Sequence, residues 1–147
     1  MTIKISSGLR ASLLSDYGLK AMMDYGFISI YSGEQPETAS MPATGTLLGR
    51  VTQDGDTFVV NTTTGGLQTE LSDQGGLVKS GTWKLTGMAT GQAGWWRWQW
   101  NAPDTGAFSP YYPRMDGAVG ESLILGTTSI TPSTLVTITE FYVNFME

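Results

Sequence analysis

The sequence contains no cysteine and no histidine, and only 14% of its 147 residues are charged. Without cysteine, the chain has no disulfide, thiolate nucleophile or cysteine-ligated metal centre. Without histidine, it has no Ser-His-Asp triad, imidazole base or histidine-ligated metal. The charged share of a typical soluble domain is about 25%. Two explanations fit the low charge here: uncharged polar side chains cover the surface, or partner molecules cover part of it.

Positive charge is also scarce, with 8 Lys and Arg against 13 Asp and Glu, and the basic residues form no run. Because affinity for phosphate backbones comes from clustered Lys and Arg, we expect no nucleic-acid partner. No segment approaches the roughly 18–20 apolar residues of a membrane span, so no membrane partner is expected. Residues 1–8 lack the apolar stretch of a signal peptide, which favours synthesis and retention in a cytoplasm.

Glycine, threonine and serine are abundant, with 19, 20 and 13 copies that together make 52 of the 147 residues. This composition favours strands and turns. The length is that of one ordinary domain, and we find neither a repeat nor an interdomain linker. We therefore predict an N-terminal arm over residues 1–7 and a single domain over 8–147.

Residues 6–25 are the helix-like stretch, and they predict two short helices at about 8–25. Ser6 or Ser7 can cap the first helix, since a hydroxyl accepts a hydrogen bond from a free backbone N–H. Ser15 or Asp16 offers a second cap.

The rest of the chain reads as strands separated by Gly- and Pro-rich turns. The spacing of several strands, 8–12 residues, predicts a mainly β fold, an antiparallel β-sandwich of jelly-roll-like type. Asp54-Gly55 predicts a hairpin turn between two of the strands, and residues 102–120 read as one long loop. The predicted strands are 27–31, 46–52, 57–61, 83–85, 94–101, 122–125 and 134–145.

A run of tryptophans, Trp95-Trp96-Arg97-Trp98-Gln99-Trp100, lies in the strand predicted over 94–101. Alternation places Trp96, Trp98 and Trp100 on one face and Trp95 with Arg97 on the other. The three rings either fill the core or form an exposed platform for a partner protein or a sugar. A protein partner is the better of the two platform readings, because few polar groups lie near the rings in sequence.

The acidic residues suggest three kinds of chemistry, and none has a distinctive setting. Asp54-Gly55-Asp56 lacks the spacing of a calcium loop and reads better as a turn. Glu140 interrupts an apolar strand; it faces solvent, sits at a bulge, or pairs with a cation such as Arg97 or Arg114. We assign no catalytic, cofactor or metal site and predict that the chain is not an enzyme. The carboxylates that could in principle act in pairs are Asp104, Asp116, Glu121 and Glu140.

Several segments occur in an order that resembles small virion proteins of tailed bacteriophages. They are Met1–Arg10 (MTIKISSGLR), Gly26–Gly33 (GFISIYSG) followed by Pro36, Asp104–Ala107 (DTGA) and Pro113–Gly120 (PRMDGAVG). The resemblance covers motifs from both ends of the chain, and the tryptophan run departs from it.

The resemblance implies a structural virion protein. Its leading role would be a capsid decoration, or cement, protein, an oligomer such as a homotrimer that binds the major capsid protein on the capsid exterior. A tail, baseplate or head–tail connector protein is the first alternative. A carbohydrate-binding module using Trp95–Trp100 is the second. We expect the arm Thr2–Ser7 to add to a neighbour's sheet edge and the loop 102–120 to supply a second contact. The candidate interface residues are Ile3, Ile5, Trp95, Arg97, Phe108, Tyr111, Tyr112 and Arg114.

Overall fold

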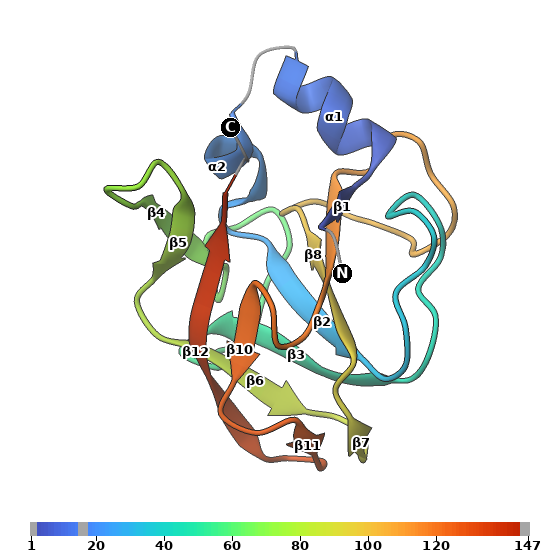
Figure 1. The fold of residues 1–147 in the computed structure, drawn as a ribbon, viewed down its shortest axis with the longest axis vertical. Helices are drawn as coiled ribbons and strands as arrows, with labels where there is room; N and C mark the ends of the chain where they lie inside the picture. The colour runs from blue at the N-terminus through green and yellow to red at the C-terminus, as the bar shows by residue number, and fades with distance from the viewer. Residues whose placement is uncertain (1–2, 15–17, 145–147) are drawn as a thin grey trace.

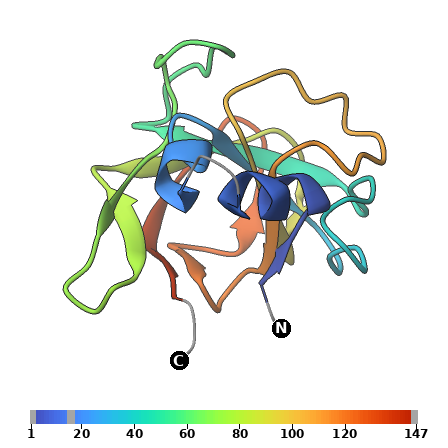
Figure 2. The ribbon, with the colours of Figure 1, turned by 90° about the horizontal axis from the view of Figure 1, so that it is seen from above.

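A computed structural model describes residues 3–14 and 18–144 (Figure 1). The chain is mainly β, with a curled antiparallel sheet and two short helices, which confirms the predicted sandwich-like class. The helices lie side by side across one end of the curled sheet (Figures 1 and 2).

The two helices are α1 (Ser7–Leu14) and α2 (Leu19–Met23), as the sequence predicts. Ser6 caps α1, because its Oγ accepts a hydrogen bond from the Leu9 N–H at 3.1 Å. The second cap predicted at Ser15 or Asp16 lies outside the described residues.

The large sheet has the strand order β1-β9-β8-β2-β3-β6-β12-β5-β4, with β10 also paired to β12. A small second sheet pairs β11 with β7. The predicted strands β2, β3, β6, β8, β10 and β12 are confirmed, whereas the short strands β1, β4, β5, β7 and β11 were not foreseen. The bounds are β1 Lys4–Ile5, β2 Phe27–Tyr31, β3 Leu47–Gln53, β4 Gln68–Leu71, β5 Leu77–Ser80, β6 Trp83–Gly87, β7 Gly91–Gln92, β8 Trp95–Gln99, β9 Arg114–Ala118, β10 Leu123–Leu125, β11 Ser129–Ile130 and β12 Leu135–Val143.

The strand predicted at 57–61 is absent, although the turn before it is present. Asp54 and Gly55 both have positive φ (56° and 79°), and the Asp56 N–H donates to the Gln53 carbonyl at 2.9 Å. Two positive φ values define the turn that normally closes a hairpin. Here both edges of β3 are already occupied, by β2 and β6. The returning chain has no edge to pair with and continues as a loop.

The loop predicted over 102–120 ends earlier, because residues 114–118 form β9 between β8 and β1. Asp116 and Gly117 have low β propensity, which explains the error. Gly117 has a packing role in the sheet, since a Cβ there would lie 2.4 Å from the ring of Trp96 on the neighbouring strand. The ring of Trp96 therefore occupies the space that any side chain at position 117 would need.

The core is built around Phe141 of β12. Its ring lies 5.1, 5.4 and 5.3 Å from the rings of Trp83, Trp96 and Trp98, and the latter two contacts are edge-on. All three tryptophans are fully buried. Trp100 packs against this core and is partly buried, so the run supplies core rather than an exposed platform.

Candidate functional site

The candidate site is an exposed loop between β8 and β9, residues 102–113, which we call the aromatic loop. It runs beside α1 (Figure 1). Phe108 and Tyr111 lie on it with 60% and 82% of their surface exposed. Large aromatic rings on a loop are costly to leave in water, so the way this loop is held decides what it can do.

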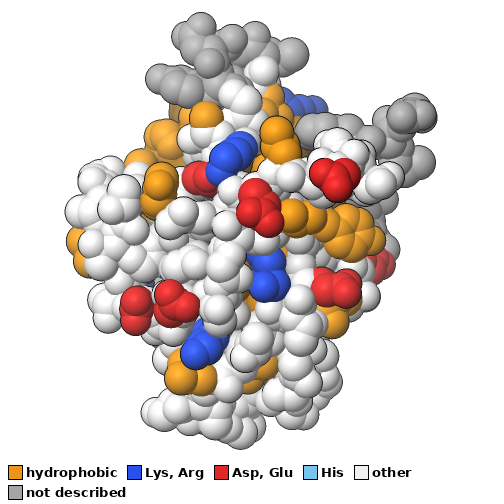
Figure 3. Space-filling model, turned by 90° about the vertical axis from the view of Figure 1, so that its left-hand side faces the viewer, with side chains coloured by type: hydrophobic (Ala, Val, Ile, Leu, Met, Phe, Trp, Pro, Cys, Tyr) orange, Lys and Arg blue, Asp and Glu red, His pale blue; other side chains and the backbone are white. Residues whose placement is uncertain are grey.

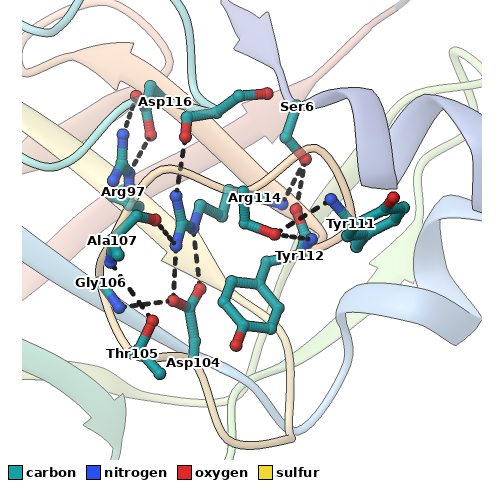
Figure 4. A network of polar contacts seen from close by, with 12 residues as sticks. Ser6, Arg97, Asp104, Thr105, Gly106, Ala107, Tyr111, Tyr112, Arg114 and Asp116 are labelled. Carbon is teal, nitrogen blue, oxygen red and sulfur yellow. Dashed lines mark hydrogen bonds and ion pairs between the residues drawn. The ribbon is translucent and has the colours of Figure 1, made fainter.

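A buried ion pair joins the two ends of the aromatic loop (Figure 4). The Arg114 guanidinium donates from Nε to Asp104 Oδ2 at 2.8 Å and from NH2 to Asp104 Oδ1 at 2.6 Å. The side chains of Arg114 and Asp104 are only 0% and 3% exposed. Arg114 also donates to the carbonyls of Ala107 at 2.9 Å and of Ser40 at 3.2 Å. One guanidinium thus fixes the start, the middle and the end of the loop.

Asp104 is held on its other side by the turn that it begins. The Gly106 N–H donates to Asp104 Oδ1 at 2.8 Å, and Gly106 has a φ of +81°, which glycine adopts without strain. Burial alone would raise the pKa of Asp104. The hydrogen bonds from Arg114 and Gly106, with the guanidinium charge, outweigh burial and hold that pKa below its ordinary value.

Two serine hydroxyls fix the rest of the loop. Ser6 Oγ donates to the Tyr112 carbonyl at 2.6 Å and accepts from the Arg114 N–H at 2.9 Å. Since it also caps α1, one hydroxyl joins the helix, the loop and β9. Ser109 Oγ accepts from the N–H groups of Tyr111 and Tyr112 at 3.0 and 3.3 Å. Tyr111 points away from this cluster (Figure 4).

A second buried ion pair lies beside the first, between directly opposed residues of β8 and β9. Arg97 donates to Asp116 from Nε and NH2, each at 2.8 Å. Burial raises the pKa of Asp116, and the charges of Arg97, Arg114 and Lys4 offset only part of that rise. Removing one member of such a pair leaves an uncompensated buried charge, so these four charges belong to the interior framework.

The prediction that Trp95, Arg97 and Arg114 supply surface contacts is wrong. They are 1%, 2% and 0% exposed, because Trp95 stacks on Tyr31 at 4.6 Å and each arginine pairs with a buried aspartate. Of the three alternatives for Glu140, the structure shows the one in which it faces solvent, and both arginines pair with other carboxylates. The burial of the tryptophan run also removes the predicted sugar platform.

The other candidates fall into two groups. Phe108 and Tyr111 are exposed, whereas Tyr112 is half-buried with the Arg114 guanidinium 5.2 Å from its ring centre. Ile3 and Ile5 pack against the core. Residues 4–5 already pair with β9 of their own chain. The described part of the arm is therefore the outermost strand of its own sheet, and an added strand from a neighbour could pair only with its outer edge.

The pairing of Asp104 with Arg114 was not foreseen. The Asp-Thr-Gly turn was the available signal, because it directs an aspartate inward onto its own backbone. In residues 3–14 and 18–144, no group of three acidic side chains is placed to hold a metal ion. No helix within the same ranges is long and apolar enough to cross a membrane.

Compared with models of protein families, with curated proteins and with solved structures, the chain shows no significant match.

Proposed function

We propose that the chain is a non-enzymatic structural protein of a tailed-phage virion. More specifically, we propose a decoration protein that binds the major capsid protein on the capsid exterior and stabilises the lattice, as a homo-oligomer such as a trimer. The observation that carries this proposal is the aromatic loop, which exposes Phe108 and Tyr111 while a buried ion pair fixes its backbone. The motif order described above supplies the virion context.

A fixed aromatic loop suits a binding surface for a physical reason. Association loses free energy when flexible side chains and loops become ordered, and a pre-ordered loop avoids much of that loss. Tyrosine is also among the residues that dominate protein interfaces, since it combines a large apolar ring with a polar hydroxyl. Tyr111, at 82% exposed, is the first anchor that we expect a partner to cover.

Two further features are consistent with a non-enzymatic protein. Two of the candidate catalytic carboxylates, Asp104 and Asp116, are each held by both oxygens in an arginine pair. On the face in Figure 3, a few acidic and basic side chains lie in small groups on a largely uncharged surface. Such a surface offers few long-range charge interactions, so contacts would depend on shape and apolar area.

The test uses heads of the phage that encodes the chain, prepared without this protein and then incubated with it. We expect saturable binding at hundreds of copies per head and greater resistance of the heads to heat. Tyr111→Ala with Phe108→Ala should weaken binding at least tenfold, a loss of about 1.4 kcal/mol. Leu135→Ala is the matched control, because Leu135 is also 60% exposed but lies on β12.

Copy number decides between the proposed role and its alternative. A few to a few dozen copies per particle, located on the tail, would instead make the chain a tail, baseplate or connector protein. Heads that are equally robust without the protein would contradict the stabilising role.

A further inference from the structure

A separate pocket of about 280 Å³ lies on the face of β3 and β6 that is turned away from the core. Arg50 and Thr52 project into it from β3, and Thr86 lies directly opposite Arg50 on β6. The turn after β3 forms the wall with Asp56 and Phe58. Small-molecule pockets span roughly 300–1,000 Å³, so this one has room for a single ring.

An aromatic pair holds the cation of this pocket in place. The Arg50 Cζ lies 5.0 Å from the ring centre of Phe27, and the Phe27 and Phe58 rings are 4.7 Å apart. A guanidinium held over a ring keeps its N–H donors free for other partners. Phe58 is half-buried and presents an apolar edge to the same space.

Apart from the stacking of Arg50 on Phe27, the polar side chains of the pocket have no partners within the described residues. No hydrogen bond or ion pair between described residues engages the side chains of Arg50, Asp56 or Thr86. Thr52 is only 6% exposed, and its hydroxyl is buried without a hydrogen-bond partner. A buried hydroxyl without a partner is unfavourable, so Thr52 is the residue whose hydrogen bond a ligand would complete.

The charges and groups define the class of ligand. The two charged side chains that line the pocket, Arg50 and Asp56, have opposite charges, which disfavours a site for a free anion or a free cation; Lys84 lies beside the lining, opposite Thr52. Together with the threonine hydroxyls they offer both donors and acceptors beside an apolar ring. We propose that this pocket binds a neutral hexose unit of a glycan, with Phe58 against the ring of the sugar and Arg50, Asp56 and Thr52 on its hydroxyls. This proposal does not depend on the capsid role.

The test is an NMR titration of the full chain with the methyl glycosides of glucose, galactose, mannose and N-acetylglucosamine. We expect a Kd on the order of 1 mM, so each glycoside is added up to about ten times that concentration. We expect saturable shifts of backbone amides in residues 50–58 and 84–88 with at least one glycoside. Arg50→Met and Asp56→Asn should each weaken that binding about tenfold or more, and Arg10→Met, on α1, is the matched control.

Thr52→Val separates a binding role from a structural one. It removes the unpartnered hydroxyl at nearly constant volume, so it should raise Tm while weakening sugar binding. The proposal is overturned if no glycoside shifts these amides, or if Arg50→Met and Thr52→Val bind as the wild type does. It is equally overturned if acetate binds more tightly than every glycoside and Asp56→Asn strengthens that binding, because the pocket would then be an anion site. If the wild-type chain binds a glycoside but does not bind phage heads, only the capsid role is contradicted.

Discussion

The ion pair between Arg114 and Asp104 gives the sharpest prediction about this fold. Asp104→Asn keeps the shape of the side chain but removes the charge that balances a guanidinium with no exposed surface. Breaking a buried pair in this way typically costs about 3–5 kcal/mol. Since whole domains are stable by about 5–15 kcal/mol, the variant should lose a large share of its free energy of unfolding.

The assay is urea unfolding of the wild type, Asp104→Asn, Arg114→Met and the double variant. Because both single variants disrupt one contact, the double variant should lose less than the sum of the two, with a coupling of roughly 1–3 kcal/mol. Hydrogen exchange of the loop amides should rise in Asp104→Asn, as the loop opens to hydrate Arg114. A loss below about 1 kcal/mol, the size typical of an exposed pair, with loop protection unchanged, would refute the reasoning.

Three further predictions concern packing, capping and pH. Gly117→Ala should cost about 1–3 kcal/mol in urea unfolding, because the added Cβ meets a tryptophan ring at 2.4 Å; the control Gly18→Ala meets nothing within 4 Å and should cost little. Ser6→Ala should lower Tm, with a loss of about 1–2 kcal/mol for the cap alone, whereas Ser7→Ala should stay within roughly 0.5 kcal/mol; equal losses would contradict the cap assignment. The pKa of Asp104 is lower in the folded protein than in the unfolded chain, where it is about 3.9. Its ionised form therefore stabilises the fold above that pH, and this stabilisation is lost as the pH falls through the folded-state pKa. Unfolding free energies from pH 6 to 3 should therefore fall less steeply in Asp104→Asn, and identical slopes would contradict this sign.

The parts of the fold that the sequence predicts are those with a strong local pattern. Apolar alternation located β2 and β8, and a hydroxyl before an apolar helix face located α1. The class of fold followed from these elements and from the spacing of the turns.

The parts that could not be predicted depend on partners distant in sequence. Residues 114–118 form a strand because β8 and β1 lie on either side, and their own propensity opposes it. The site divides in the same way. The exposed residues Phe108 and Tyr111 could be identified from residue type alone. The burial of Arg97 and Arg114 required knowing which carboxylates face them.

The hydroxyl of Ser6 has a consequence for the order of folding. It bonds to backbone groups of Tyr112 and Arg114, more than a hundred residues later in the chain, and β1 likewise pairs with β9. Contacts at such separation form late, since the intervening chain must first be brought together. During synthesis the N-terminal segment must therefore wait for most of the chain to be made. The aromatic loop gains its contacts to Ser6 only after residues 112–114 have been made.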